Sequence, residues 1–321
     1  MALKYLLNRK SLLDFGHPQK PWDIFISAYN NSERVKTIYE KVNAPQKHWV
    51  ILPEYGYTPE ECAQLPDKIV PQLNANEEQV AREITKSVMN RRRRLIARED
   101  LVKQKVCIDI TGFMRPQIMY MIRQMHERGL NTFDVIYTEP QQYARKEDTT
   151  FSGEEIEIVR QVMGYEGAHT DETTNDILIL GVGYDDDPMS RVINEKDSAK
   201  LIQLLSLPSL SADMYQESIL RLDRTDAPSA LDEQTIFAPA NDPFVIAYEL
   251  SSKCRAMEKR GAITNMYLCP LATKPQALGF SLFYLHELQD KAASILFPFV
   301  KKYHKETSTG VGKTWLYEVT L

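Results

Sequence analysis

Val106-Cys-Ile-Asp-Ile-Thr-Gly-Phe-Met-Arg-Pro-Gln-Ile-Met-Tyr-Met-Ile-Arg123 is the stretch of sequence that decides the fold. Residues 106–110 form an apolar run of strand length, Thr111 and Gly112 interrupt it, and Pro116 suits the first turn of a helix. A helix start offers free backbone N–H groups and the positive end of the helix dipole, and Arg115 adds a full positive charge. The stretch therefore predicts a strand, a turn and a helix, with an anion such as phosphate bound at the turn.

Residues 265–284 repeat this construction, with an apolar strand, a turn, a basic residue, Pro-Gln and an apolar helix. The repetition continues downstream. Tyr143 lies 27 positions after Pro116 (143 − 116), and Tyr303 lies 28 positions after Pro275 (303 − 275). Basic residues follow both tyrosines within two positions.

The match also extends upstream, where Asp23-Ile-Phe-Ile and Asp176-Ile-Leu-Ile each begin an apolar strand. Each strand leads into a polar turn and then into an Arg-Val pair, at Arg34 and Arg191. We interpret these repeated features as an internal duplication.

The composition is that of an ordinary soluble globular protein, with 43% hydrophobic and 26% charged residues in a chain of 321, long enough for two domains. The net charge of −5 argues against a protein that coats nucleic acid. No apolar run has the length of a membrane span, and the N-terminus lacks a secretory signal, so we expect a cytoplasmic protein that does not bind membranes. The four cysteines show no Cys-x-x-Cys spacing, and we expect them to be reduced.

Strands alternate with helical patterns along the chain, which favours an α/β fold with mostly parallel sheets. A polar link near residues 164–175 divides the chain into two Rossmann-like halves, residues 1–165 and 170–321. The last two strands, residues 294–298 and 314–320, flank a turn-rich segment, and we expect them to form a terminal antiparallel pair.

Helices are also expected at residues 77–99 and 154–163. The first contains the basic run Arg91–Arg94. In an acidic protein we interpret this run as a solvated or partner-facing helix surface in preference to a nucleic-acid site.

Ligands of open parallel sheets bind beyond the carboxyl ends of the strands, so the polar and basic residues of these turns are the candidate ligand-binding residues. A tyrosine beside a base could stack on a nucleobase and bind a phosphate. The alternative is that the turns only connect elements and that the charged loops are solvated. The candidates are Asn30, Ser32, Arg34, Thr111, Gly112, Arg115, Gln117, Tyr143, Arg145, Arg191, Thr273, Lys274, Gln276, Tyr303 and Lys305.

Other motifs carry less weight. We interpret Asp185–Asp187 as a helix start before Pro188, because adjacent carboxylates seldom converge on one metal ion. The Gly181-x-Gly183 pair lacks the third glycine of a dinucleotide fingerprint. No nucleophile elbow, Walker loop, His-Glu-x-x-His or Cys/His cluster occurs, so we expect no metal and no cofactor, name no catalytic residue and leave open whether the protein is an enzyme.

The segments Ile108-Asp-Ile-Thr-Gly112 and Leu271-Ala-Thr-Lys-Pro275 resemble the strand-to-turn motif of CRISPR-associated Rossmann-fold (CARF) sensor domains. Related SAVED domains are fused pairs of such units, which would suit a duplication. The double glycine of the family is Gly112-Phe113 here, and Leu271-Ala272 in the second segment. The strand beginning at Asp23 is also similar to the opening strand of TIR domains, but no catalytic glutamate of that family can be aligned, so we treat this similarity as coincidence.

The resemblance implies a module that binds a nucleotide or cyclic oligonucleotide, as a bacterial defence or signalling sensor that acts with a separate effector protein and could form a homodimer. An alternative is a nucleotide-processing enzyme, either a ring-opening phosphodiesterase or a nucleosidase, that uses the same cleft. A third alternative is an interaction subunit with a vestigial cleft.

Overall fold

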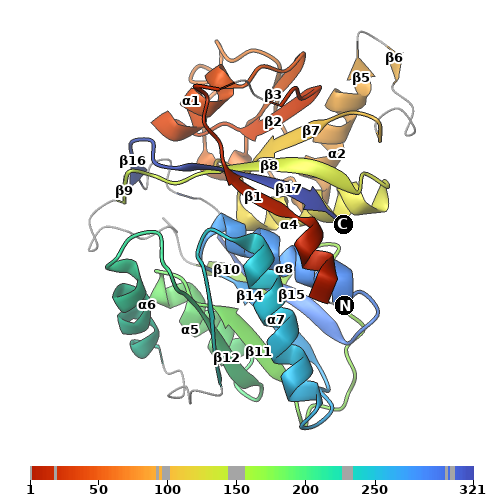
Figure 1. Cartoon of the computed structure of the whole chain (residues 1–321), viewed down its shortest axis with the longest axis vertical. Coiled ribbons are helices and arrows are strands. Elements are labelled where there is room, and N and C mark those ends of the chain that lie inside the picture. The colour runs from red at the N-terminus through yellow and green to blue at the C-terminus, as the bar shows by residue number, and fades with distance from the viewer. Residues whose placement is uncertain are drawn as a thin grey trace. The chain divides into compact units, whose positions relative to one another are not determined.

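The computed structural model describes residues 2–17, 20–91, 94–95, 102–143, 156–225, 234–300, 303 and 308–321. The chain divides into two compact units, which are described separately (Figure 1). Unit 1 comprises Met1–Leu6 and Glu154–Lys301, and unit 2 comprises Leu7–Gly153 and Lys302–Leu321. The chain therefore passes from unit 1 into unit 2, returns to unit 1 and ends in unit 2. This division differs from the predicted boundaries, because the last segment belongs with the first half of the sequence.

Unit 2 is built on a seven-stranded sheet with the order β1-β17-β8-β7-β2-β3-β4. Five of these strands are parallel and, numbered along the chain, lie in the order 3-2-1-4-5. Two small two-stranded antiparallel sheets, β5–β6 and β9–β16, lie outside the large sheet. The elements are β1 (Arg9–Leu12), β2 (Ile24–Ala28), α1 (Glu33–Lys41), β3 (Gln46–Val50), the 3-10 helix η2 (Pro53–Tyr55), β4 (Lys68–Ile69), α2 (Glu77–Met89), β5 (Asn90–Arg91), β6 (Arg94–Leu95), β7 (Val106–Asp109), α4 (Arg115–Glu127), β8 (Thr132–Thr138), β9 (Gln142–Tyr143), β16 (Ser308–Thr309) and β17 (Thr314–Thr320).

Alternate side chains of the central strands face opposite helical layers. Phe25 and Cys107 belong to a buried cluster with Val35 of α1. Their neighbours Ile26 and Ile108 instead line a cavity beside α2 and α4. Because side chains alternate across a strand, α1 covers one face of the sheet and the α2–α4 pair covers the other.

Unit 1 has a six-stranded sheet with the order β10-β15-β14-β11-β12-β13. Helices α7 and α8 pack against each other, as do α5 and α6. The elements are the 3-10 helix η1 (Ala2–Leu7), β10 (Ile156–Gln161), β11 (Ile177–Gly181), α5 (Asp186–Glu195), β12 (Lys200–Ser206), α6 (Met214–Asp223), β13 (Thr235–Ala238), α7 (Pro243–Glu258), β14 (Met266–Pro270), α8 (Lys274–Glu287) and β15 (Ala293–Val300).

The parallel strands of unit 1 also follow the order 3-2-1-4-5, since β11, β12, β13, β14 and β15 are consecutive in the chain. The predicted α/β fold with mostly parallel sheets is therefore confirmed. The strands that begin after Asp23 and Asp176 both occupy the first position, and Arg115 and Lys274 both begin the helix after the fourth strand. An internal duplication would produce this correspondence, and the common origin of the two units stays a prediction.

The antiparallel edge strands differ from the predicted arrangement in two ways. A terminal antiparallel strand is present, but β17 pairs with β8 and β1, whereas β15 belongs to the other sheet. The predicted helix at residues 154–163 is wrong, because residues 156–161 form β10 and pair with β15. In both cases a distant strand edge supplies hydrogen-bond partners that local patterns do not reveal.

The predicted helix at residues 77–99 is too long. Helix α2 ends at Met89, and Arg91 and Arg94 are paired residues of the antiparallel strands β5 and β6. The interpretation of the basic run as a helix surface is therefore wrong, and Arg92 and Arg93 lie outside the described residues.

Candidate functional site

Buried hydrogen bonds hold the turn between β7 and α4. The fully buried Asp109 accepts hydrogen bonds from Ser27 Oγ at 3.0 Å and from the Thr111 backbone N–H at 2.9 Å. Thr111 Oγ1 in turn accepts from the Thr138 N–H at 3.0 Å. The predicted ligand-binding residue Thr111 thus ties the end of β7 to the end of β8.

Gly112 follows in the same turn and lies against the end of β2. A Cβ atom at this position would be 2.0 Å from the Ala28 carbonyl oxygen, far inside van der Waals contact. Gly112 therefore has a packing role, because only a residue without a side chain lets the β7 turn approach β2 so closely.

Tyr55, in η2 after β3, links the ends of three strands. Its hydroxyl donates to the Gly112 carbonyl at 2.9 Å and also hydrogen-bonds to Asn30. Burial raises the pKa of Tyr55, the charge of Arg34 lowers it, and the charge of Glu54 raises it again. Asn30, Arg34 and Glu54 therefore lie close to one buried hydroxyl.

Asn30, Ser32 and Arg34 lie between β2 and the first turn of α1. Asn30 Oδ1 accepts from the Ser32 N–H at 2.9 Å, which fixes the turn. Ser32 is the N-cap of α1, yet its hydroxyl makes no capping hydrogen bond. Arg34 is half-buried and donates from Nη1 to the Thr138 carbonyl at 2.9 Å, at the end of β8.

Glu54 and Gln117 form the other side of this group. Gln117 Nε2 donates to Glu54 Oε1 at 2.6 Å, joining η2 to the first turn of α4. Gln117 is only 4% exposed. Burial raises the pKa of Glu54, and the hydrogen bond from Gln117 opposes this shift only in part.

Four buried atoms in this group have no hydrogen-bond partner among the described residues: Ser32 Oγ, Arg34 Nε, Glu54 Oε2 and Gln117 Oε1. Buried polar side chains are nearly always hydrogen-bonded, so four such atoms on neighbouring loops are exceptional. We call the set Asn30, Ser32, Arg34, Glu54, Tyr55 and Gln117 the strand-end site, because its members follow the carboxyl ends of β2, β3 and β7.

The strand-end site lies where bound molecules are expected in such a sheet. The parallel strand order reverses between β2 and β7, and ligands of open α/β sheets bind beyond the strand ends at this reversal. Gly112 and Tyr55 connect the two strands across this point. Four members of the set were predicted from the sequence as ligand-binding residues, whereas Glu54 and Tyr55 were not.

The corresponding turn of unit 1 is organised differently. Thr273 caps α8 by accepting from the Gln276 N–H at 3.2 Å, and its hydroxyl donates to the Ala240 carbonyl at 2.5 Å. Gln276 is fully buried and accepts from the Ala272 N–H at 3.1 Å, so its side chain folds back onto its own turn. Its Nε2 has no partner in the described part of the chain.

One residue of the first strand explains why Gln117 and Gln276 differ. Gly181 ends β11, and a Cβ there would lie 2.1 Å from Gln276 Oε1. Ala28 is the last residue of β2, the position that Gly181 has in β11, and it carries a Cβ atom. The folded-back position of Gln276 is therefore available only beside a glycine, and Gln117 extends instead to Glu54.

Several predicted site residues lie elsewhere. Arg34 is the second residue of α1, whereas Arg191 is the sixth residue of α5 and is exposed, because Asp186–Pro188 occupy the helix start. Arg191 is therefore not equivalent to Arg34. Asp186 instead pairs with Arg221 of α6 at 3.1 Å.

The tyrosine-containing segments are only partly described. Tyr143 lies in β9, and its side chain is not described. The Tyr303 N–H donates to the Glu54 carbonyl at 2.9 Å, so Tyr303 lies beside the strand-end site. Arg145 and Lys305 lie outside the described residues.

Arg115 and Lys274 each begin a helix with proline at the second position. Both are half-buried, and each makes an interaction within the structure. Arg115 belongs to unit 2 and Lys274 to unit 1. A single anion site shared by both stays a prediction.

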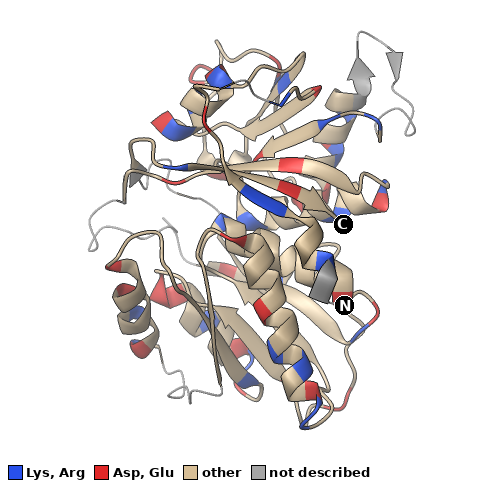
Figure 2. Ribbon diagram, in the orientation of Figure 1, with Lys and Arg blue, Asp and Glu red and all other residues tan. Residues whose placement is uncertain are grey.

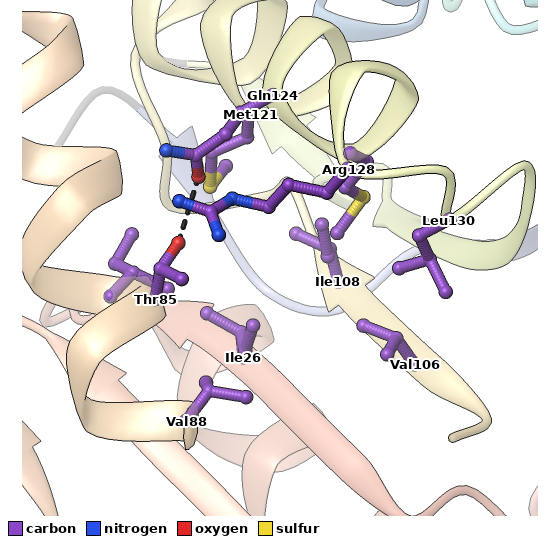
Figure 3. A pocket seen from close by; sticks show the side chains of 11 residues that line it. Ile26, Thr85, Val88, Val106, Ile108, Met121, Gln124, Arg128 and Leu130 are labelled. Atoms are coloured by element: carbon purple, nitrogen blue, oxygen red, sulfur yellow. Dashed lines mark hydrogen bonds between the residues drawn. The ribbon is translucent and has the colours of Figure 1, made fainter. Parts of the chain in front are cut away.

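Other features of the described residues do not suggest a second reactive centre. No group of three His, Cys, Asp or Glu side chains that could hold a metal ion occurs there. Figure 2 shows Lys and Arg interspersed with Asp and Glu on both units. A cavity of about 50 Å³ beneath α2 and α4 is mostly apolar, with Thr85 donating to Gln124 at 2.8 Å on its rim (Figure 3).

A sequence signal for Glu54 did exist. It is an acidic residue after the second strand, 24 positions beyond Asn30 (54 − 30). Dinucleotide-binding sheets place an acidic residue about 20 positions after the first turn. Residues 30–32 are Asn-Asn-Ser and not a glycine-rich turn, so the spacing alone did not identify Glu54.

No protein-family model, curated protein or solved structure matches the chain. Within the part of the chain that the structure describes, the helices are too short or too polar to cross a membrane.

Proposed function

We propose that unit 2 binds a nucleotide at the strand-end site. The observation that carries this proposal is the set of four buried polar atoms without partners in the described residues. Each such atom costs about 1–3 kcal/mol unless something bonds to it, so the arrangement favours a polar ligand.

The chemistry of the four atoms supports a nucleotide over a simple anion. Arg34 offers a guanidinium N–H, and the first turns of α1 and α4 offer backbone N–H groups, all of which suit a phosphate. Glu54 Oε2 and Gln117 Oε1 are acceptors, which require donors such as sugar hydroxyls or base N–H groups. A nucleotide carries both kinds of group.

The finer proposal is a sensor of cyclic oligonucleotides in bacterial defence or signalling, acting with a separate effector protein. Its support is the resemblance of the two strand-to-turn segments to CARF domains, together with a Rossmann-like sheet in each unit.

The first test is whether a nucleotide copurifies with the protein, detected by mass spectrometry after denaturation. The second is titration calorimetry with mononucleotides, dinucleotides and cyclic oligonucleotides. Arg34→Ala should weaken binding by about 10- to 100-fold, because a charge-assisted hydrogen bond contributes roughly 1.5–3 kcal/mol. The matched control is Arg82→Ala, because Arg82 is 60% exposed on α2 and pairs only with its helical neighbour Glu78 in the described residues.

Binding that survives Arg34→Ala unchanged, or a wild-type protein that binds none of these compounds, contradicts the proposal. If the wild-type protein binds none of these compounds, ordered water satisfies the four atoms, and the chain is better interpreted as an interaction subunit with a vestigial cleft.

A second candidate function is nucleotide processing, favoured by the state of Glu54. Its pKa is raised by burial, and one of its oxygens has no partner among the described residues, as a general acid or base requires. Chromatography of a cyclic oligonucleotide and of a mononucleotide after incubation with the protein tests for ring opening and for base release. Glu54→Gln should abolish either reaction, and recovery of intact ligand from a protein that binds it shows binding without turnover.

A further inference from the structure

We infer that Glu54, positioned by Gln117, recognises a ribose hydroxyl of the bound nucleotide. The inference rests on the proposed function, because it assigns one part of the ligand to one part of the strand-end site. It adds the prediction that the protein distinguishes ribonucleotides from deoxyribonucleotides.

The place of Glu54 in the sheet is the first argument. β2 is the first parallel strand and β3 is its neighbour and the second, and Glu54 lies in η2, four residues beyond the end of β3 (54 − 50). In dinucleotide-binding sheets a carboxylate at the end of the second strand accepts a hydrogen bond from the ribose. The same topology places Glu54 beside the reversal point of the strand order.

The state of the two side chains is the second argument. The short hydrogen bond between Gln117 Nε2 and Glu54 Oε1, 2.6 Å long, holds both groups in place. It leaves one oxygen on each, Glu54 Oε2 and Gln117 Oε1, without a partner in the described residues. Two adjacent acceptors require a ligand with hydrogen-bond donors, and phosphate oxygens provide none.

The cation of the site is the third argument. Arg34 lies in the first turn of α1 and donates from Nη1 to the Thr138 carbonyl, and its charge acts on the same buried Tyr55 hydroxyl as that of Glu54. Its Nε is the unpartnered cationic donor of the set in the described residues, and the Ser32 hydroxyl is a neutral one. A nucleotide can therefore place its phosphate near Arg34 and its sugar near Glu54. The guanidinium would donate to phosphate oxygens, and the carboxylate would accept from a sugar hydroxyl.

The described residues of unit 1 do not repeat this arrangement, so the inference concerns unit 2. Gln276 folds back onto Ala272 beside Gly181, and the residues that follow β12 are Leu207-Pro-Ser209, without a carboxylate. The recognition of a ribose hydroxyl is thus assigned to unit 2 alone.

The experiment compares AMP, GMP, CMP and UMP with their 2′-deoxy counterparts by titration calorimetry. Wild type should prefer the ribonucleotides by about 10- to 100-fold, the range expected for one hydrogen bond to a charged group. Glu54→Gln, which keeps the size of the side chain and removes its charge, should reduce this ratio towards one. Glu40→Gln, at an exposed position on α1, is the matched control and should leave the ratio unchanged.

The outcomes separate this inference from the proposed function. A wild-type protein that binds both sugar forms equally, or a ratio that Glu54→Gln leaves unchanged, overturns the ribose assignment while nucleotide binding stands. Discrimination between bases that Glu54→Gln removes also overturns it, because the carboxylate would then contact the base. Failure of wild type to bind any of the eight compounds or a cyclic dinucleotide counts instead against the proposed function. Unfolding curves of both variants show whether a loss of binding reflects a loss of fold.

Discussion

Replacing Gly112 by alanine tests whether the turn after β7 depends on close packing against β2. The added Cβ would lie 2.0 Å from the Ala28 carbonyl oxygen and 2.9 Å from its carbonyl carbon. Ala28 cannot easily move, because β2 is hydrogen-bonded to β3 on one side and to β7 on the other. Overpacking costs typically 1–3 kcal/mol where side chains can adjust, so we expect a loss of at least about 3 kcal/mol here.

Tryptophan fluorescence during urea unfolding measures this loss in the relevant unit, since Trp22, Trp49 and Trp315 all belong to unit 2. With a slope of about 2 kcal/mol per molar urea, a loss of about 3 kcal/mol lowers the midpoint by about 1.5 M.

Gly129→Ala is the control for this substitution. Gly129 has φ +79° and nothing within 4 Å of an added Cβ, so alanine there tests only the left-handed backbone and should cost about 1 kcal/mol. A Gly112→Ala midpoint no lower than that of Gly129→Ala refutes the packing argument.

Three further predictions concern other parts of the chain. Gly181→Ala should destabilise unit 1 by about 1–3 kcal/mol, because the added Cβ would lie 2.1 Å from Gln276 Oε1. The double variant Gly181→Ala/Gln276→Ala should recover part of this loss, and circular dichroism during unfolding of both variants measures it. The raised pKa of Glu54 means that the folded protein keeps a proton that the unfolded chain has already lost, so the stability of unit 2 should fall as the pH rises above the ordinary glutamate value, from about pH 4 upwards. Glu54→Gln should flatten that decline in the fluorescence midpoint, and an identical slope in both proteins would contradict the assignment. Burial raises the pKa of Cys254 to about 12, and all four cysteines are buried, so a thiol reagent at pH 8 should label none of them within minutes before unfolding and all four afterwards.

The two units use the same local sequence features in different ways. Pro-Gln begins α4 and α8 alike, yet Gln117 bonds to Glu54 and Gln276 bonds to its own turn. The deciding residue is the last one of the first strand, alanine in β2 and glycine in β11. The methyl group of Ala28 therefore accounts for the different side-chain partners of Gln117, which bonds to Glu54, and Gln276, which bonds to the Ala272 N–H.

Many strands and helices of the α/β fold could be predicted from the sequence, because the patterns that indicate them are local. The apolar runs after Asp23 and Asp176 became the buried strands β2 and β11, and proline marked the starts of α4 and α8. Apolar runs, proline and glycine influence the backbone over only a few residues. They therefore predict a strand or helix whose own apolar side chains become buried in the core. The positions of Asn30, Arg34 and Gln117 at strand ends followed from the same reasoning.

The tertiary structure alone decided which strands pair and which polar groups meet. Residues 156–161 form a strand because β15 offers its edge, and β17 lies beside β8, nearly two hundred positions away in the sequence (314 − 132 = 182). Glu54 bonds to Gln117, which is 63 positions away in the sequence, and no local pattern predicts this contact. Strand pairing and burial depend on partners that folding brings together from a distance, and for this reason local sequence patterns predicted most of the elements but neither β10 nor the contact between Glu54 and Gln117.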